Sequence, residues 1–220
     1  MTRSELAAMI DHTLLKPGAT DAHVDELCRE ALEHCFRTVC VNPCRVRRAA
    51  DLLGGSAVGV CSVAGFPLGA SVPGVKAAEA ARAVQDGATE VDMVANVGAL
   101  LSGDTALVGE DIADVVAASQ GQVVKVIIEA ALLDDEQKAL VCGIAVDSGA
   151  GFVKTSTGFG PGGATIEDVR LMRTTVGEAV GVKAAGGIRT YEQAIGMIEA
   201  GASRIGASSS VAILEGADEK

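Results

Sequence analysis

Four charged residues stand at equivalent places in four successive β-branched segments of this 220-residue sequence. Each directly follows a valine, and the four are Asp92, Lys125, Lys154 and Lys183. Because side chains alternate between the two faces of a strand, each valine and its charged neighbour point in opposite directions. If the valines pack outward under helices, the four charges point inward. Any one of them alone would be read as a strand-end residue that extends to water, but four in neighbouring strands predict a catalytic group, because buried charge is costly.

Two of the lysines indicate a particular reaction. Lys154 and Lys183 belong to successive predicted strands, which lie about 4.8 Å apart when they pair, so their ammonium groups can come close. Like charge and desolvation then lower the pKa of one of them, and a change from about 10.4 to about 7 corresponds to roughly 4.6 kcal/mol. A neutral lysine amine is a nucleophile that forms an iminium with a carbonyl substrate. Asp92 is the expected general acid and base, relaying protons through water.

Glycine-rich turns follow the later strands. In α/β barrels the turns after strands seven and eight commonly bind phosphate through backbone N–H groups and a short helix N-terminus. Each turn alone could be a simple glycine turn or a serine helix cap, but the two together occur where barrels bind phosphate. The predicted substrate-binding residues in these turns and at the strand ends are Thr157, Gly158, Gly186, Gly187, Gly206, Ser208 and Ser209. Asp11, Cys40 and Lys125, on other predicted strands, are further candidates for the pocket.

The segment 158–163 also matches the letters of the G-x-G-x-x-G dinucleotide fingerprint. We reject that interpretation because the next strand ends in no acidic residue that could bind a ribose, and Lys154 occupies a position where a packed apolar residue is needed. The segment is better interpreted as a mobile loop beside the reactive lysine, with Thr165 beginning the next helix.

No metal or cofactor is expected. Cys40 and Cys44, with His34 and Cys35 nearby, match no common zinc spacing. His12 and the other two histidines lack a serine or cysteine nucleophile motif, and His23 and His34 are expected on a helix surface. The six cysteines are expected to be reduced thiols, because a chain with a large core needs no disulfide framework.

The elements that must position these residues alternate between strand and helix. The predicted strands are 10–14, 38–41, 57–64, 90–96, 123–130, 152–157, 181–185 and 204–207. Helical patterns at 75–85, 135–146, 166–176 and 191–199 separate several of them. Strand and helix in alternation predict parallel pairing, and eight strands favour a closed (β/α)8 TIM barrel, with an extra N-terminal helix over its floor. With no linker in the sequence, residues 1–220 are expected to form one domain.

The composition excludes several classes of function. Hydrophobic residues make up 49% of the chain but aromatic residues only 2%, so the core is built from aliphatic side chains. A formal net charge of −11 and the lack of a basic, aromatic groove argue against nucleic acid and anionic membranes as partners. The sequence shows neither a membrane-spanning stretch nor a signal peptide, so a soluble, cytoplasmic protein is expected.

Several ordered motifs resemble those of the deoxyribose-phosphate aldolase family. They are 152–158, 181–190 and 90–94, together with 204–209, 125–129 and 11–16. The resemblance runs nearly end to end. It implies a class I aldolase on a (β/α)8 barrel that cleaves 2-deoxy-D-ribose 5-phosphate to acetaldehyde and D-glyceraldehyde 3-phosphate, without a metal. It also implies a homodimer.

The same resemblance implies a role for each residue of the charged group. Lys154 matches the Schiff-base lysine, Lys183 its neighbour that lowers its pKa, and Asp92 the acid of the proton relay. Two departures stand out. Some members have a lysine where this chain has Phe159, which removes one phosphate contact, and some end in a tyrosine tail, whereas the only tyrosine here is Tyr191.

Two other functions fit parts of the pattern. One is another phosphate-binding barrel enzyme, either an isomerase or a Schiff-base aldolase for a different sugar phosphate. The other is a non-catalytic paralogue that binds a sugar phosphate, against which the joint presence of Lys154, Lys183 and Asp92 argues.

Overall fold

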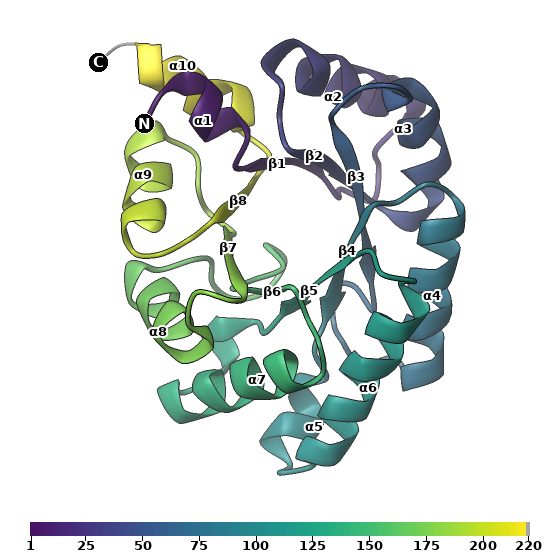
Figure 1. Cartoon of the computed structure of the whole chain (residues 1–220), viewed down its shortest axis with the longest axis vertical. Coiled ribbons are helices and arrows are strands. Elements are labelled where there is room, and N and C mark those ends of the chain that lie inside the picture. Colours follow the sequence, from purple (N-terminus) through teal and green to yellow (C-terminus); the bar gives the residue numbers. More distant parts are fainter. Residues whose placement is uncertain (219–220) are drawn as a thin grey trace.

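A computed structural model describes residues 1–218 of the chain. Eight parallel strands pair in sequence order and close into a barrel (Figure 1). They are β1 (Ile10–Leu14), β2 (Thr38–Val41), β3 (Gly59–Ala64), β4 (Glu90–Val94), β5 (Val123–Ile127), β6 (Phe152–Lys154), β7 (Gly181–Ala185) and β8 (Arg204–Ala207). The predicted (β/α)8 TIM barrel is confirmed. The domain expected from the sequence runs to Lys220, so its last two residues lie outside the described part.

Helices form a ring outside the strands (Figure 1). They are α1 (Arg3–Ala7), α2 (Asp21–His34), α3 (Val46–Leu53), α4 (Pro73–Gln85), α5 (Val97–Leu101), α6 (Thr105–Ala118), α7 (Asp135–Asp147), α8 (Ile166–Val176), α9 (Tyr191–Glu199) and α10 (Ser210–Asp218). Two 3-10 turns, η1 (Pro43–Arg45) and η2 (Ala130–Leu132), follow β2 and β5. Thr165 caps α8, as predicted, and Thr190 forms a capping box with Gln193 at the start of α9. In the described residues, no helix combines the length and apolar character that crossing a membrane requires.

The main core lies between the strands and the helices. The four valines that precede the charged residues are all buried in it, namely Val91, Val124, Val153 and Val182. Alanines of the surrounding helices, such as Ala80 and Ala145, belong to the same core. The predicted alternation is therefore confirmed: the valines face the helices and the charged residues face the barrel interior.

Two expectations about the elements differ from the structure. The N-terminal helix exists, but α1 packs against α10 outside the ring of strands rather than over the floor of the barrel (Figure 1). The strands around the reactive lysine are also shorter than predicted, because β5 ends at Ile127 and β6 at Lys154. The β-branched residues beyond Lys154 instead build a turn at the mouth of the barrel, where Thr155 donates its hydroxyl to the carbonyl of Ala185 at 2.9 Å.

Candidate active site

The four charged residues predicted from the sequence meet inside the barrel around Asp92. Strand register places Asp92 beside Lys125 and Lys154 beside Lys183. Three ammonium groups donate to the Asp92 carboxylate: Lys125 at 2.7 Å, Lys154 at 2.8 Å and Lys183 at 2.7 Å. None of the four residues exposes more than 3% of its surface. The alternative that these lysines extend separately to water is therefore wrong.

Three further charged residues extend this group toward the floor of the barrel. Lys183 contacts Asp11 at 2.5 Å, and Lys125 contacts Glu90 at 2.6 Å. Arg204 donates to both of these carboxylates, at 2.6 Å to Asp11 and 2.9 Å to Glu90. The sequence analysis missed Glu90 and Arg204. Strand alternation could have found Glu90, because it stands two residues before Asp92 and so shares its face.

Mutual contacts keep most of this network charged. Burial alone would raise the pKa of the Asp92 carboxyl, but the charges of Lys125, Lys154 and Lys183 outweigh burial and hold that pKa well below its ordinary value. In the same way, burial would lower the pKa of Lys183, but the carboxylates of Asp11 and Asp92 raise it above the ordinary lysine value. At neutral pH Asp92 is therefore a carboxylate and Lys183 an ammonium.

Lys154 differs from the other cations of the network. Among the described residues, five cations contact the three carboxylates of this network: Lys125, Lys154, Lys183 and Arg204 from inside the barrel, and the exposed Arg37, which lies 4.0 Å from Glu90. Lys125, Lys183 and Arg204 each contact at least two carboxylates, whereas Lys154 contacts only Asp92. The geometry therefore singles out Lys154 as the amine of this group that can act as a nucleophile.

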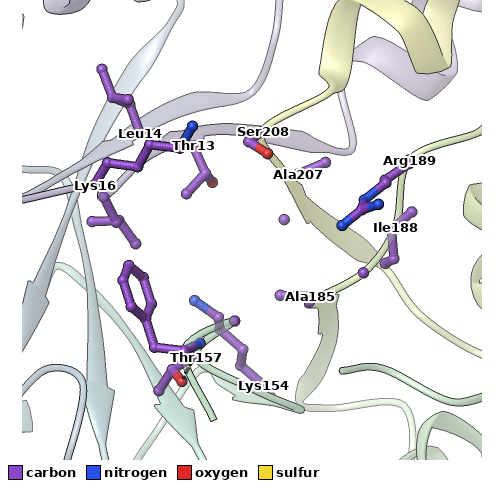
Figure 2. A pocket seen from close by; sticks show the side chains of 16 residues that line it. Thr13, Leu14, Lys16, Lys154, Thr157, Ala185, Ile188, Arg189, Ala207 and Ser208 are labelled. Atoms are coloured by element: carbon purple, nitrogen blue, oxygen red, sulfur yellow. Dashed lines mark hydrogen bonds between the residues drawn. The ribbon is translucent and has the colours of Figure 1, made fainter. Parts of the chain in front are cut away.

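A cavity of about 350 Å³ opens above the network, at the carboxyl ends of the strands. Residues after β1, β6, β7 and β8 line it (Figure 2): Thr13, Leu14, Leu15, Lys16, Lys154, Thr157, Gly158, Phe159, Ala185, Gly186, Gly187, Ile188, Arg189, Gly206, Ala207 and Ser208. Of the four cations inside the barrel, only Lys154 is part of this wall. The cavity is thus a substrate-sized space with one reactive amine at its base.

Backbone N–H groups are available in the glycine turns of this cavity. Gly158, Gly186 and Gly187 all have left-handed backbones, with φ values of 83°, 94° and 82°. Across residues 1–218, no hydrogen bond uses the amide of Gly158 or of Gly187. Six of the predicted substrate-binding residues line the cavity, namely Thr157, Gly158, Gly186, Gly187, Gly206 and Ser208. This arrangement can bind an anion through N–H donors.

The remaining predicted substrate-binding residues lie elsewhere. Asp11, Cys40 and Lys125 are fully buried and are not among the residues that line this cavity. Asp11 and Lys125 belong to the ion network, and Cys40 pairs in register with Cys61 on the adjacent strand. Ser209 lines a neighbouring cavity of about 650 Å³ between the segments after β1 and β8.

Two cations in the cavity wall were missed by the sequence analysis. Figure 2 shows Lys16 and Arg189 on opposite sides of the cavity, after β1 and β7. Both are exposed, and neither forms an ion pair with a residue that the structure describes. Their position directly after strand ends is the signal that could have identified them. They are free to bind an anionic part of a substrate.

The ligand chemistry of the barrel interior does not fit a metal ion. In residues 1–218, one group has metal-like spacing, with ligand atoms of Cys40, Cys61 and Asp92 within 4.8 Å of one another. Both oxygens of Asp92 already accept from ammonium groups, so a cation there would face three positive charges. The second possible metal site, considered in the sequence analysis, does not form around Cys40. Cys35 and Cys44 are exposed, whereas Cys40 is buried.

Comparisons with known proteins agree with this site. A family model described as DeoC/LacD family aldolase matches residues 6–216. A deoxyribose-phosphate aldolase of Brevibacillus brevis is 60% identical over 208 residues, which cover 94% of each chain. A deoxyribose-phosphate aldolase of Thermococcus kodakarensis is 57% identical, with 100% of both chains covered. The solved structure of deoxyribose phosphate aldolase from Aeropyrum pernix is 38% identical and matches with a TM-score of 0.91, covering 97% of this chain and 91% of that one. With the family model and these relatives spanning almost all of its length, the chain belongs to the DeoC/LacD family of aldolases.

Proposed function

We propose that this protein is a class I aldolase that reversibly cleaves 2-deoxy-D-ribose 5-phosphate to acetaldehyde and D-glyceraldehyde 3-phosphate. The observation that carries the proposal is the position of Lys154. It is the one lysine of the Asp92 group that lines the cavity, and Asp92 is its only carboxylate partner among the described residues. The names of the relatives support the choice of substrate.

The reaction begins on the aldehyde of the open-chain sugar. The neutral amine of Lys154 attacks C1 and loses water to form an iminium. Removal of the proton from the C3 hydroxyl then breaks the C2–C3 bond, and its electrons move into the iminium to give an enamine and D-glyceraldehyde 3-phosphate. Protonation of the enamine at C2 and hydrolysis by water release acetaldehyde and restore the amine.

The network below the cavity supports these steps. Asp92 holds the Lys154 amine at 2.8 Å and Lys183 at 2.7 Å through the same carboxylate oxygen, Oδ2. Because the pKa of Asp92 lies well below its ordinary value, this group stays a carboxylate and holds both ammonium groups beside the reacting carbon. In our proposal, Lys183 keeps a positive charge beside Lys154 and so favours its neutral form.

The phosphate end of the substrate is expected at the wall of the cavity rather than at its base. The free amides of Gly158 and Gly187 lie in that wall. Because Lys16 and Arg189 lie on opposite sides of the cavity, we expect one of them, and not both, to supply the positive charge that Phe159 does not supply at its own position. Phosphate bound there would place the aldehyde end toward Lys154 at the base of the cavity.

The direct test is a cleavage assay with a panel of sugar phosphates. The proposal predicts formation of acetaldehyde and D-glyceraldehyde 3-phosphate from 2-deoxy-D-ribose 5-phosphate, and much slower cleavage of other sugar phosphates. Preference for another sugar would favour the alternative of a different barrel aldolase or isomerase. Binding without turnover of any member would favour the non-catalytic paralogue.

A chelator is expected to leave this activity unchanged. The iminium on Lys154 supplies the electron sink that a metal-dependent aldolase takes from its zinc ion. Activity is measured after dialysis against EDTA, with the untreated protein as control. Activity that disappears with the chelator and returns with added metal would contradict the Schiff-base mechanism.

We further propose that the protein acts in the cytoplasm on small molecules and as a homodimer. Its net charge of −11 supports the lack of nucleic-acid or anionic-membrane partners. Light scattering of the purified full-length chain measures the oligomeric state, and a monomeric mass at assay concentration would contradict the dimer.

A further inference from the structure

Glu129 is a buried acidic residue that the proposed mechanism does not use. It follows β5 and exposes only 4% of its surface. Its φ of 51° is left-handed, a conformation uncommon for residues other than glycine, and such residues cluster at functional sites. Within residues 1–218, its carboxylate forms no ion pair with a lysine, arginine or histidine. The hydrogen bonds that the Glu129 carboxylate accepts therefore indicate the role of this residue.

All of the side-chain hydrogen bonds of Glu129 go to Thr157, in the turn after β6. The Thr157 hydroxyl donates to Oε2 at 2.5 Å, and the Thr157 amide approaches the two carboxylate oxygens at 3.4 Å and 3.3 Å. The same hydroxyl accepts from the amide of Phe159 at 3.1 Å. The amides on either side of Gly158 are thus engaged, while that of Gly158 itself has no partner in the described chain.

The backbone around Glu129 aims the side chain at this turn. The Ile128 amide donates to the carbonyl of Lys154 at 3.0 Å, and the Ala130 amide donates to that of Thr155 at 2.9 Å. Between these two hydrogen bonds, the segment after β5 has one residue more than the segment after β6. That extra residue is Glu129. Its left-handed conformation absorbs the mismatch, as in a β-bulge that redirects a side chain.

The turn also closes tightly over the carboxylate. A Cβ atom added at Gly160 would lie 2.8–3.1 Å from the carboxyl carbon and oxygens of Glu129. Beyond it, the Phe159 ring meets Phe66 edge-on, with centroids 5.3 Å apart. The segment from Thr157 to Gly160 is therefore held at its base by Glu129 and on its outer side by Phe66.

We propose that Glu129 is a positioning residue that fixes the Thr157–Phe159 turn so that the Gly158 amide is presented to the phosphate of the substrate. This inference rests on the proposed function, because it concerns the phosphate end of that same cavity. Glu129 itself does not line the cavity that holds Lys154. It acts through Thr157 and Gly158, which do.

Two substitutions at this position separate the carboxylate from the backbone. Glu129→Gly removes the side chain and accepts the left-handed backbone without strain. Glu129→Gln keeps one carbonyl acceptor for the Thr157 hydroxyl but removes the charge, so it should retain part of the function. Glu110→Gln, at an exposed site on α6, is the matched control for loss of a charge.

Kinetics with and without the phosphate give the decisive comparison. For Glu129→Gly we expect a rise in KM of roughly tenfold for 2-deoxy-D-ribose 5-phosphate, the cost of misplacing about one anion-binding donor, with a smaller change in kcat. KM for 2-deoxy-D-ribose, which has no phosphate, should stay near the wild-type value. Glu129→Gln should lie between wild type and Glu129→Gly, and Glu110→Gln should match wild type.

Equal increases in KM for both sugars, or a loss of kcat alone, would overturn the proposal, because Glu129 would then act on the reactive lysine or on the barrel as a whole. Binding of glycerol 3-phosphate, measured by calorimetry, needs no turnover and so tests Glu129 even if the wild-type protein does not cleave the proposed substrate. Affinity unchanged in Glu129→Gly would also overturn it. If Glu129→Gly does not fold, Thr157→Val tests the same hydrogen bond, and it should bind glycerol 3-phosphate more weakly than the Glu110→Gln control does.

Discussion

At the scale of single residues, contacts rather than residue type distinguish the reactive lysine. Lys125, Lys154 and Lys183 follow valines in the same way, and all three donate to Asp92. Lys183 has a second carboxylate in Asp11, at 2.5 Å, and Lys125 has one in Glu90, at 2.6 Å. Lys154 has no second carboxylate in the described chain, and it faces the cavity. Its chemistry therefore follows from charges on other strands of the barrel, including the adjacent β7.

The role of Lys183 can be tested separately from that of Lys154. Lys183→Leu removes one positive charge from Asp92 Oδ2, the oxygen that Lys154 also contacts. Iminium formation at neutral pH should fall by roughly 10- to 100-fold, the effect expected from one nearby like charge, and recover in part as the pH rises. Single-turnover trapping across a pH series measures this.

Lys183→Arg is the matched control, because it keeps the positive charge while changing the shape of the side chain. The acidic limb of its pH profile for iminium formation should stay near that of wild type, even if its maximal rate is lower. If the acidic limb of the Lys183→Leu profile lay at the wild-type pH, Lys183 would not favour the neutral form of Lys154.

At the scale of elements, the sequence predicted the polar face of the central strands and most strand bounds, but it began β3 two residues early and ended β4, β5 and β6 too late. The alternation of valine with charged residues indicated the interior because both faces of these strands carry a clear pattern. The ends of β5 and β6 were placed too late, because β-branched residues such as Thr155 and Thr157 continue a strand pattern while their side chains bond to neighbouring segments. Glu129 was seen as part of a motif without a role, since its partner Thr157 lies 28 residues away.

A buried ion pair separate from the barrel network connects α4 and α6, outside the active site. The sequence analysis did not predict it. Lys76 of α4 is fully buried and donates to Asp111 of α6 at 2.5 Å and to the carbonyl of Val94, at the end of β4, at 2.9 Å. A lysine in a helix is ordinarily exposed, so composition and pattern gave no reason to bury it.

Breaking this pair is expected to destabilise the fold without changing the chemistry. Asp111→Ala leaves the Lys76 ammonium buried without a counter-charge, so the free energy of unfolding should fall by about 3–5 kcal/mol. Replacing both residues, in Lys76→Met with Asp111→Leu, should cost much less because no buried charge remains. Urea unfolding of both variants measures the difference, and equal losses would contradict the explanation.

At the scale of the whole molecule, the barrel has two interiors of opposite character. The layer between strands and helices is aliphatic, whereas the centre of the barrel holds a chain of ion pairs from Arg204 to Lys154. Closing the sheet removes water from these charges, and that exclusion is what makes their mutual effects strong. The sequence predicted the upper half of this chain but missed Glu90, which shares the inward face of β4 with Asp92, and Arg204, a single charge at the start of β8.

The same ion network makes the free energy of unfolding depend on pH. The pKa values of Asp11 and Asp92 are lowered in the folded state, because the cations around these buried carboxyls outweigh burial. Their contribution to stability is therefore complete above the ordinary aspartate pKa of about 3.9 and is lost as the pH falls below it. Over that range each carboxyl takes up a proton on unfolding.

In the acidic range, the Asp11→Asn variant should lose stability less steeply with falling pH than wild type does. One fewer proton is taken up, so the slope of the free energy of unfolding should be shallower by about 1.4 kcal/mol per pH unit. Urea unfolding at several pH values between about 2 and about 4 measures both slopes. Identical slopes would mean that Asp11 is not held ionised by the network.

The central claim is that Lys154, one of the three lysines around Asp92, performs the covalent step. Reduction with borohydride in the presence of acetaldehyde converts the iminium into a stable N-ethyl lysine, and mass mapping of the peptides identifies the modified residue. We expect the modification on Lys154 alone, and its loss in a folded Lys154→Ala variant. Modification of Lys183 or Lys125 in the wild-type protein, or trapping that persists in Lys154→Ala, would contradict the assignment.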